Sequence, residues 1–144
     1  MGSGHLMTRD TARAMSEENV EIVRAFFEEA LLDPENGGKK YLAEDVEYVP
    51  FSRMAAPSRG PAGFLDQIAD IADQFEIYEV QAERLEEVGG RVVADLRRRA
   101  KSKRGPVEVT DRFAEIFTLH DGRIVRIQAL PTVEEARKVA RLRE

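Results

Sequence analysis

Apolar and polar positions alternate between residues 107 and 130 in a pattern that predicts a long β-hairpin. Its turn falls at His120-Asp121-Gly122, because Asp-Gly readily adopts the positive φ angles of a tight turn between strands. Side chains alternate along a strand, so the apolar odd positions of 107–119 should face the core. Asp111 and Glu115 lie on that face. A carboxylate among Phe and Val side chains is costly without a partner or a task, so this pair predicts a site.

The rest of the pattern predicts helices first and strands later. Helical spacing of apolar residues covers 16–32, 62–73 and 133–142, with a short helical turn at 39–43 and with Ser16 and Thr132 as N-caps. Strand-like alternation covers 46–49, 75–87 with a bulge, and 91–100, with a loop over 51–61 and a tight turn at Gly89-Gly90. This order predicts an α+β domain, in which helices pack on a curved antiparallel sheet whose conical interior is a natural small-molecule cavity.

The first 15 residues are expected to lie outside this domain. Residues 1–7 have the composition of a linker and are interpreted as a cloning remnant, and residues 8–15 are polar and expected to be disordered. Residues 16–144 then form one domain, since a chain of 144 residues with 42% apolar positions suits a single core.

Composition narrows the chemistry. The chain has no cysteine, which excludes disulfides and thiol nucleophiles, and His120 is its one histidine beyond the presumed remnant, so we expect neither a metal nor another cofactor. A net charge of −5 argues against nucleic-acid binding despite the basic residues of 97–104. No apolar run approaches the roughly 20 residues that cross a bilayer, and no signal-peptide core precedes the first helix. We therefore expect a soluble, cytoplasmic protein with no membrane partner.

Strand pairing extends the prediction for the two acids. If the connection 101–106 centres near Lys103 and Arg104, Val92 faces Glu115, and Arg98 lies diagonal to Asp111, within reach of an ion pair. By the same reasoning the Asp121 turn sets Glu115 opposite Ile127. Glu115 then has apolar walls and no counter-charge, so burial should raise its pKa and suit it to general acid or base catalysis. The alternative readings are that Glu115 only holds an ordered water and that the Asp111–Arg98 pair is structural.

Four segments together resemble the SnoaL-like branch of the NTF2-like superfamily, over about residues 16–137. They are Ser-Glu-Glu-Asn-Val-Glu-Ile-Val-Arg at 16–24, Asp-Val-Glu-Tyr at 45–48, Arg59-Gly60, and Phe-Thr-Leu-His-Asp-Gly-Arg-Ile-Val-Arg-Ile at 117–127. The resemblance implies a conical fold with an apolar pocket, usually dimeric through the sheet. Ala114, Ile116 and Ile124, predicted to face outward, support the homodimer. The superfamily includes polyketide cyclases, ketosteroid isomerases, epoxide hydrolases, dehydratases and binding proteins, so the fold does not settle the chemistry.

When the resemblance is applied residue by residue, it implies that this chain matches only part of the ketosteroid isomerase site. Glu115 falls where ketosteroid isomerases place a protonated aspartic acid that donates to an oxyanion. Tyr48 falls where they place their aspartate base, and Phe26 or Phe27 falls where they place a helix tyrosine, so two of three roles are missing. Arg98, Asp111 and Glu115 resemble the Asp-Arg-Asp arrangement of the small epoxide hydrolases.

We therefore expect a pocket for a small, mostly apolar organic molecule, in which Glu115 moves a proton and Asp111, Arg98 or Tyr48 orients a ligand oxygen. The expected apolar lining comprises Phe26, Phe27, Phe64, Ile68, Phe113, Phe117 and Ile127. The alternative is a non-catalytic binding or dimerisation module with a small or filled pocket, and cavity volume beside Glu115 distinguishes the two. A third possibility, epoxide or ester hydrolysis, needs a water held jointly by Glu115 and Asp111.

Overall fold

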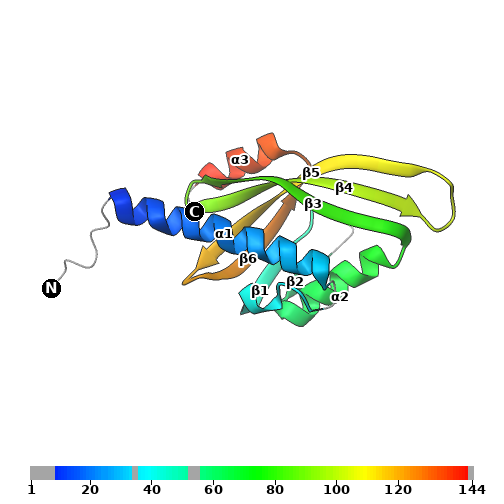
Figure 1. Ribbon diagram of the computed structural model, residues 1–144, viewed down its shortest axis with the longest axis horizontal. Helices are drawn as coiled ribbons and strands as arrows, with labels where there is room; N and C mark the ends of the chain where they lie inside the picture. The colour runs from blue at the N-terminus through cyan, green and yellow to red at the C-terminus, as the bar shows by residue number, and fades with distance from the viewer. Residues whose placement is uncertain (1–8, 34–35, 52–55, 143–144) are drawn as a thin grey trace.

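A curved sheet with helices on both of its faces forms the framework of the protein (Figure 1). The computed structural model describes residues 9–33, 36–51 and 56–142, without the side chains of 9–13. The helices are α1 (Arg9–Leu32), the short 3-10 helix η2 (Lys39–Tyr41), α2 (Gly60–Ala72) and α3 (Val133–Arg141). The strands are β1 (Leu42–Val49), β2 (Ser58–Arg59), β3 (Phe75–Val88), β4 (Arg91–Ser102), β5 (Glu108–His120) and β6 (Arg123–Leu130). The predicted α+β class is confirmed.

The sheet has the strand order β2-β1-β6-β5-β4-β3. It was predicted to be antiparallel throughout, but it is mixed. Strands β3 to β6 form antiparallel pairs between neighbours in sequence, whereas β1 and β6 pair in parallel, with Tyr48 opposite Ile127. Local alternation predicts hairpins because a tight turn links their strands. It carries no signal for a parallel pair whose strands are more than seventy residues apart.

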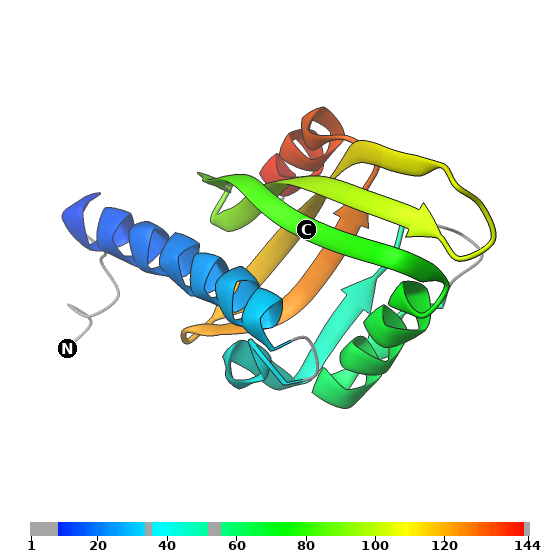
Figure 2. The same cartoon turned by 45° about the vertical axis from the view of Figure 1, so that its right-hand side comes forward.

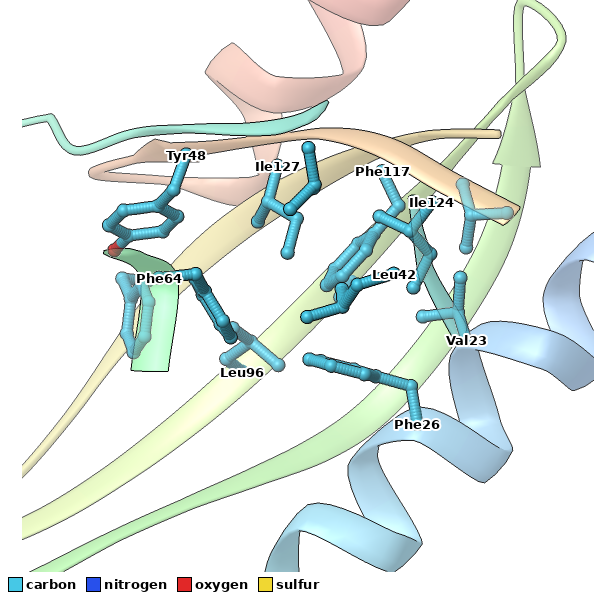
Figure 3. Close-up of a cluster of buried hydrophobic side chains, with 13 residues drawn as sticks. Val23, Phe26, Leu42, Tyr48, Phe64, Leu96, Phe117, Ile124 and Ile127 are labelled. Atoms are coloured by element: carbon cyan, nitrogen blue, oxygen red, sulfur yellow. The ribbon is translucent and has the colours of Figure 1, made fainter. Parts of the chain in front are cut away.

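Each face of the sheet has its own apolar core. Helices α1 and α2 cover one face, and side chains such as Val23, Phe26 and Phe64 meet the sheet there (Figures 2 and 3). Helix α3 covers the other face, where Ala136 and Ala140 pack on Val93, Ala114 and Ile116. The central strand β5 is therefore buried on both sides from Phe113 to Phe117.

This arrangement corrects the predicted outward face. Ala114 and Ile116 are buried beneath α3, and Ile124 belongs to the core beneath α1, so these three residues are not free to form a dimer contact. Val107 and Val109, expected in the core, are exposed because the far end of the β4–β5 hairpin projects beyond the helices (Figure 2).

Two further boundaries differ from the prediction. Helix α1 begins at Arg9, so the predicted N-cap Ser16 lies inside the helix; its first turns extend past the edge of the sheet and have no core to cover (Figure 1). The predicted loop 51–61 contains β2, which pairs with β1, Ser58 lying opposite Tyr48. Residues 1–8 and 52–55 lie outside the described residues, so the remnant interpretation of 1–7 and that part of the loop are not assessed.

The predicted tight turns are confirmed. Gly89 and Gly90 have φ angles of 61° and 83°, and Asp121 and Gly122 have 50° and 76°. These positive angles are those of a two-residue turn that matches the twist of its strands. The α3 N-cap is confirmed as well, since the Thr132 side chain accepts a hydrogen bond from the Glu135 backbone N–H.

The predicted strand registers are each wrong by two residues. Glu115 faces Ala94 on β4 and Ala129 on β6, in place of Val92 and Ile127. The β4–β5 connection centres one residue later than expected, and a bulge between Thr118 and Leu119 shifts the β5–β6 pairing. Glu115 was still predicted to face the correct side of the sheet, because a shift of two residues leaves a side chain on the same side. Ile124, beyond the bulge, faces the side opposite to the predicted one.

Candidate functional site

A cavity of about 220 Å³ lies between α1, α2 and the sheet. Its walls are mostly apolar: Phe26, Phe27, Ala30, Leu31, Gly37, Phe64, Leu65, Ile68, Ala72, Tyr78, Glu79, Val80 and Glu115 line it. An apolar cavity of about 150 Å³ is known to hold benzene, so this one has the volume of a single substituted ring. The aromatic side chains thus leave a void beside Glu115 instead of filling it.

Glu115 occupies the cavity wall from the middle of β5. Its neighbours across the sheet, Ala94 and Ala129, are small and fully or almost fully buried, so the longer Glu115 side chain stands between two alanines. The residue is only 8% exposed, and among the described residues no hydrogen bond or ion pair reaches its carboxyl group. Burial raises the pKa of Glu115 to about 8, so its carboxyl group is mostly neutral at pH 7.

Tyr48 lies close to this carboxyl without lining the cavity itself. It is buried on β1 in the same row across the sheet as Ile127 and Phe117, and its ring packs edge-on against Phe64, with centroids 5.3 Å apart (Figure 3). Burial first, and then the negative charge of Glu115, raise the pKa of Tyr48 well above its ordinary value. The Tyr48 hydroxyl therefore keeps its proton and can only act as a neutral donor or acceptor.

The predicted Arg98–Asp111 ion pair is confirmed, with the two residues directly opposite each other and not diagonal. Arg98 Nε donates to Asp111 Oδ1 at 2.9 Å, and Nη2 donates to Oδ2 at 2.6 Å. The guanidinium group lies 5.3 Å from the centre of the Phe113 ring, a cation–π distance. This hydrogen-bonded pairing lowers the pKa of Asp111. The side chains remain 29% and 40% exposed, and neither lines the cavity, so Asp111 is committed to Arg98.

Tyr78 is the cavity residue that sequence reasoning missed. It lies on the inward side of β3 and lines the cavity; burial raises its pKa, and a hydrogen bond from Arg98 partly offsets that effect. The alternation of apolar and polar residues that would have placed Tyr78 inward is present in the sequence, but it is interrupted. The predicted β3 bulge is confirmed between Ala82 and Arg84, and in the stretch from 78 to 82 the even positions Tyr78, Val80 and Ala82 are half-buried while 79 and 81 are exposed.

Five of the predicted site residues come together in the cavity and the others do not. Phe26, Phe27, Phe64, Ile68 and Glu115 line it. Phe113, Phe117 and Ile127 are core residues that do not line it, and the register shift places Ile127 opposite Phe117, one row beyond Glu115. Within the described residues, no three histidine or carboxylate side chains gather in a way that would hold a metal ion. None of the helices described is long and apolar enough to cross a bilayer.

Comparison with known proteins identifies relatives of this arrangement. Residues 9–127 match the model of the SnoaL-like domain family. TerC, solved in co-crystals with polyporic acid, shares 22% identity over 87% of this chain and 99% of its own, with a TM-score of 0.70. An LEH-like epoxide hydrolase from M. tuberculosis shares 19% identity over 79% of this chain and 82% of its own, with a TM-score of 0.62.

A third structure comes from Jannaschia sp. CCS1, a protein named for its likeness to SnoaL polyketide cyclases. It shares 18% identity over 90% of this chain and 96% of its own, with a TM-score of 0.68. At such identities these structures establish the common fold and not a common activity. No curated protein matches the chain.

Proposed function

The chain belongs to the SnoaL-like domain family, and from this premise we propose that its cavity binds a small, mostly apolar molecule on which Glu115 transfers a proton, in a reaction of the cyclase or isomerase type. One observation carries the proposal. A buried carboxyl group without a partner among the described residues stands in the wall of an apolar cavity large enough for one ring. A carboxyl pKa near neutrality is the property that acid–base catalysis requires.

The proposed chemistry needs only the side chains of this chain. In its ionised form Glu115 takes a proton from a carbon next to a carbonyl group, the C–H electron pair becomes the double bond of an enolate, and the same carboxyl returns the proton to carbon. Negative charge develops on the ligand oxygen during this step. Hydroxyl donors that are already in place stabilise such charge. Tyr48 remains protonated next to Glu115, but it does not line the cavity, so we assign it no contact with the ligand oxygen.

Proton exchange tests this function without knowledge of the natural substrate. The protein is incubated with acetophenone in D₂O, and deuterium entering the methyl group is measured by mass spectrometry. We expect exchange above the buffer rate, and Glu115→Gln should abolish the excess. Because the ionised carboxyl is the base, the rate should rise with pH and level off above about 8.

Glu108→Gln is the matched control, since Glu108 is an exposed carboxylate on the same strand, paired with Arg99. Exchange that persists in Glu115→Gln would contradict the catalytic role. Binding of acetophenone without any exchange would support the alternative of a non-catalytic binding module.

Epoxide hydrolysis receives less support from the geometry. Asp111 lies four positions before Glu115 on β5, which is about 13 Å in an extended strand. Asp111 pairs with Arg98 outside the cavity that Glu115 lines. A single water held by both carboxyl groups would require that ion pair to open, so we do not propose this reaction.

A further inference from the structure

Resting on the proposed function, we propose that the Tyr78 hydroxyl, held by Arg98, recognises a carbonyl oxygen of the ligand, and that the ligand class is neutral carbonyl compounds of about one ring. Tyr78 lines the cavity on β3, while Glu115 lines it on β5, so the two groups approach a bound molecule from different strands. Its ring stacks on Phe75, with centroids 5.4 Å apart, which fixes its position from the outer side.

The direction of the hydrogen bonds follows from the chemistry of arginine. A guanidinium group has only donors, so in the hydrogen bond that we propose between Arg98 and Tyr78, by which Arg98 lowers the pKa of Tyr78, the tyrosine oxygen is the acceptor. The hydroxyl hydrogen of Tyr78 then remains available to donate to another acceptor. Two other N–H groups of Arg98 are bound to Asp111, which keeps the guanidinium group in place over Phe113. Asp111 is therefore a positioning residue that acts on the ligand through Arg98 and Tyr78.

The charges around the cavity favour a neutral ligand over a carboxylate. Arg98 and Asp111 neutralise each other, and Glu79, the other acid in the cavity wall, pairs with Arg99 at 3.4 Å. Glu115 is mostly neutral at pH 7 and becomes negative at higher pH. No unpaired cation lines the cavity among the residues described, whereas Glu115 and Tyr78 both offer O–H donors. A carbonyl oxygen satisfies such donors without bringing a charge into an apolar site.

Three probes of similar size test the assignment: acetophenone, α-methylstyrene, in which a CH₂ group replaces the carbonyl oxygen, and benzoate. Binding to the full chain is measured at pH 7 by calorimetry or by NMR titration. Tyr78→Phe removes one hydroxyl and keeps the ring that stacks on Phe75. We expect it to weaken acetophenone binding about threefold to tenfold, the worth of one hydrogen bond, and to leave α-methylstyrene binding unchanged. Benzoate should bind more weakly than acetophenone to the unmodified protein.

Tyr41→Phe is the control for loss of a tyrosine hydroxyl, because the Tyr41 hydroxyl donates to Glu29 outside the cavity. This variant should bind both neutral probes as tightly as the unmodified protein does. Equal effects of Tyr78→Phe on acetophenone and α-methylstyrene, or no effect on either, would overturn the role of Tyr78 while leaving the cavity as a binding site. Tighter binding of benzoate than of acetophenone would overturn the neutral ligand class. Binding of neither neutral probe would overturn the proposed function itself, and this inference with it.

Discussion

Glu115 shows how a carboxyl group can be buried in an apolar site without the full free-energy cost of burying a charge. Charged, it would lie among apolar side chains with no counter-ion in the described structure, which is strongly unfavourable. The protein avoids this by keeping the proton: burial raises the pKa of the group from 4.5 to about 8. The folded state therefore holds a neutral acid at pH values where the unfolded chain has released its proton.

This difference makes stability depend on pH. Between pH 4.5 and 8 the unfolded state is deprotonated at Glu115 and the folded state is not, so the free energy of unfolding falls as pH rises through that window and levels off above it. Glu115→Gln cannot titrate, so its advantage over the unmodified protein should grow by several kcal/mol from pH 5 to pH 8. Urea unfolding at the two pH values measures this. Parallel changes in the two proteins would contradict the account, and Glu108→Gln again serves as the control.

Site prediction from the sequence succeeded for residues whose role depends only on the side of the strand they occupy. The period of two placed Glu115 inward and brought Arg98 and Asp111 together, because a register error of two residues leaves the facing unchanged. The prediction failed where it also had to state which residues lie directly opposite each other on neighbouring strands. Ile127 was predicted opposite Glu115 and lies one row away, and Tyr78 was overlooked because the β3 bulge reverses which positions face inward.

At the scale of the elements, the hairpins and helices follow from local pattern, and the exceptions are the long-range ones. Asp-Gly and Gly-Gly predict tight turns wherever they separate two strands. The two residues of β2 and the parallel pairing of β1 depend on parts of the chain that are distant in sequence. The first turns of α1 lack an apolar stripe because they extend beyond the sheet, so no core-facing period marks them (Figure 2).

The β3–β4 turn provides a matched pair of substitutions. Gly89 and Gly90 both have positive φ angles, but a Cβ at Gly89 would lie 2.2 Å from the Ala140 carbonyl oxygen at the end of α3, whereas a Cβ at Gly90 meets nothing within 4 Å. Gly90→Ala should cost about 1 kcal/mol from backbone strain alone. Gly89→Ala should cost at least about 2 kcal/mol, because α3 must also move. Chemical denaturation of both variants measures the difference, and equal losses would show that the turn does not press against α3.

For the whole molecule, the homodimer through the sheet stays a prediction. Because Ala114 and Ile116 are covered by α3, such a contact would use the part of the outer face that α3 leaves open, where Thr118 and Gln128 are half-buried. Sedimentation equilibrium at micromolar concentration should give twice the 16.2 kDa chain mass, and Gln128→Glu should shift the equilibrium toward monomer by placing like charges across the two-fold axis. A single 16.2 kDa species in the unmodified protein would refute the dimer.

A direct titration of Glu115 tests the account most sharply. The side-chain carboxyl carbon is followed by ¹³C NMR from pH 4 to 10, with Glu115→Gln used to assign its signal. The structure predicts a midpoint of about 8, since the carboxyl group lies buried in the cavity wall. A midpoint near the ordinary glutamate value of 4.5 would mean that this carboxyl is solvated, and neither the proposed proton transfer nor the neutral cavity would stand.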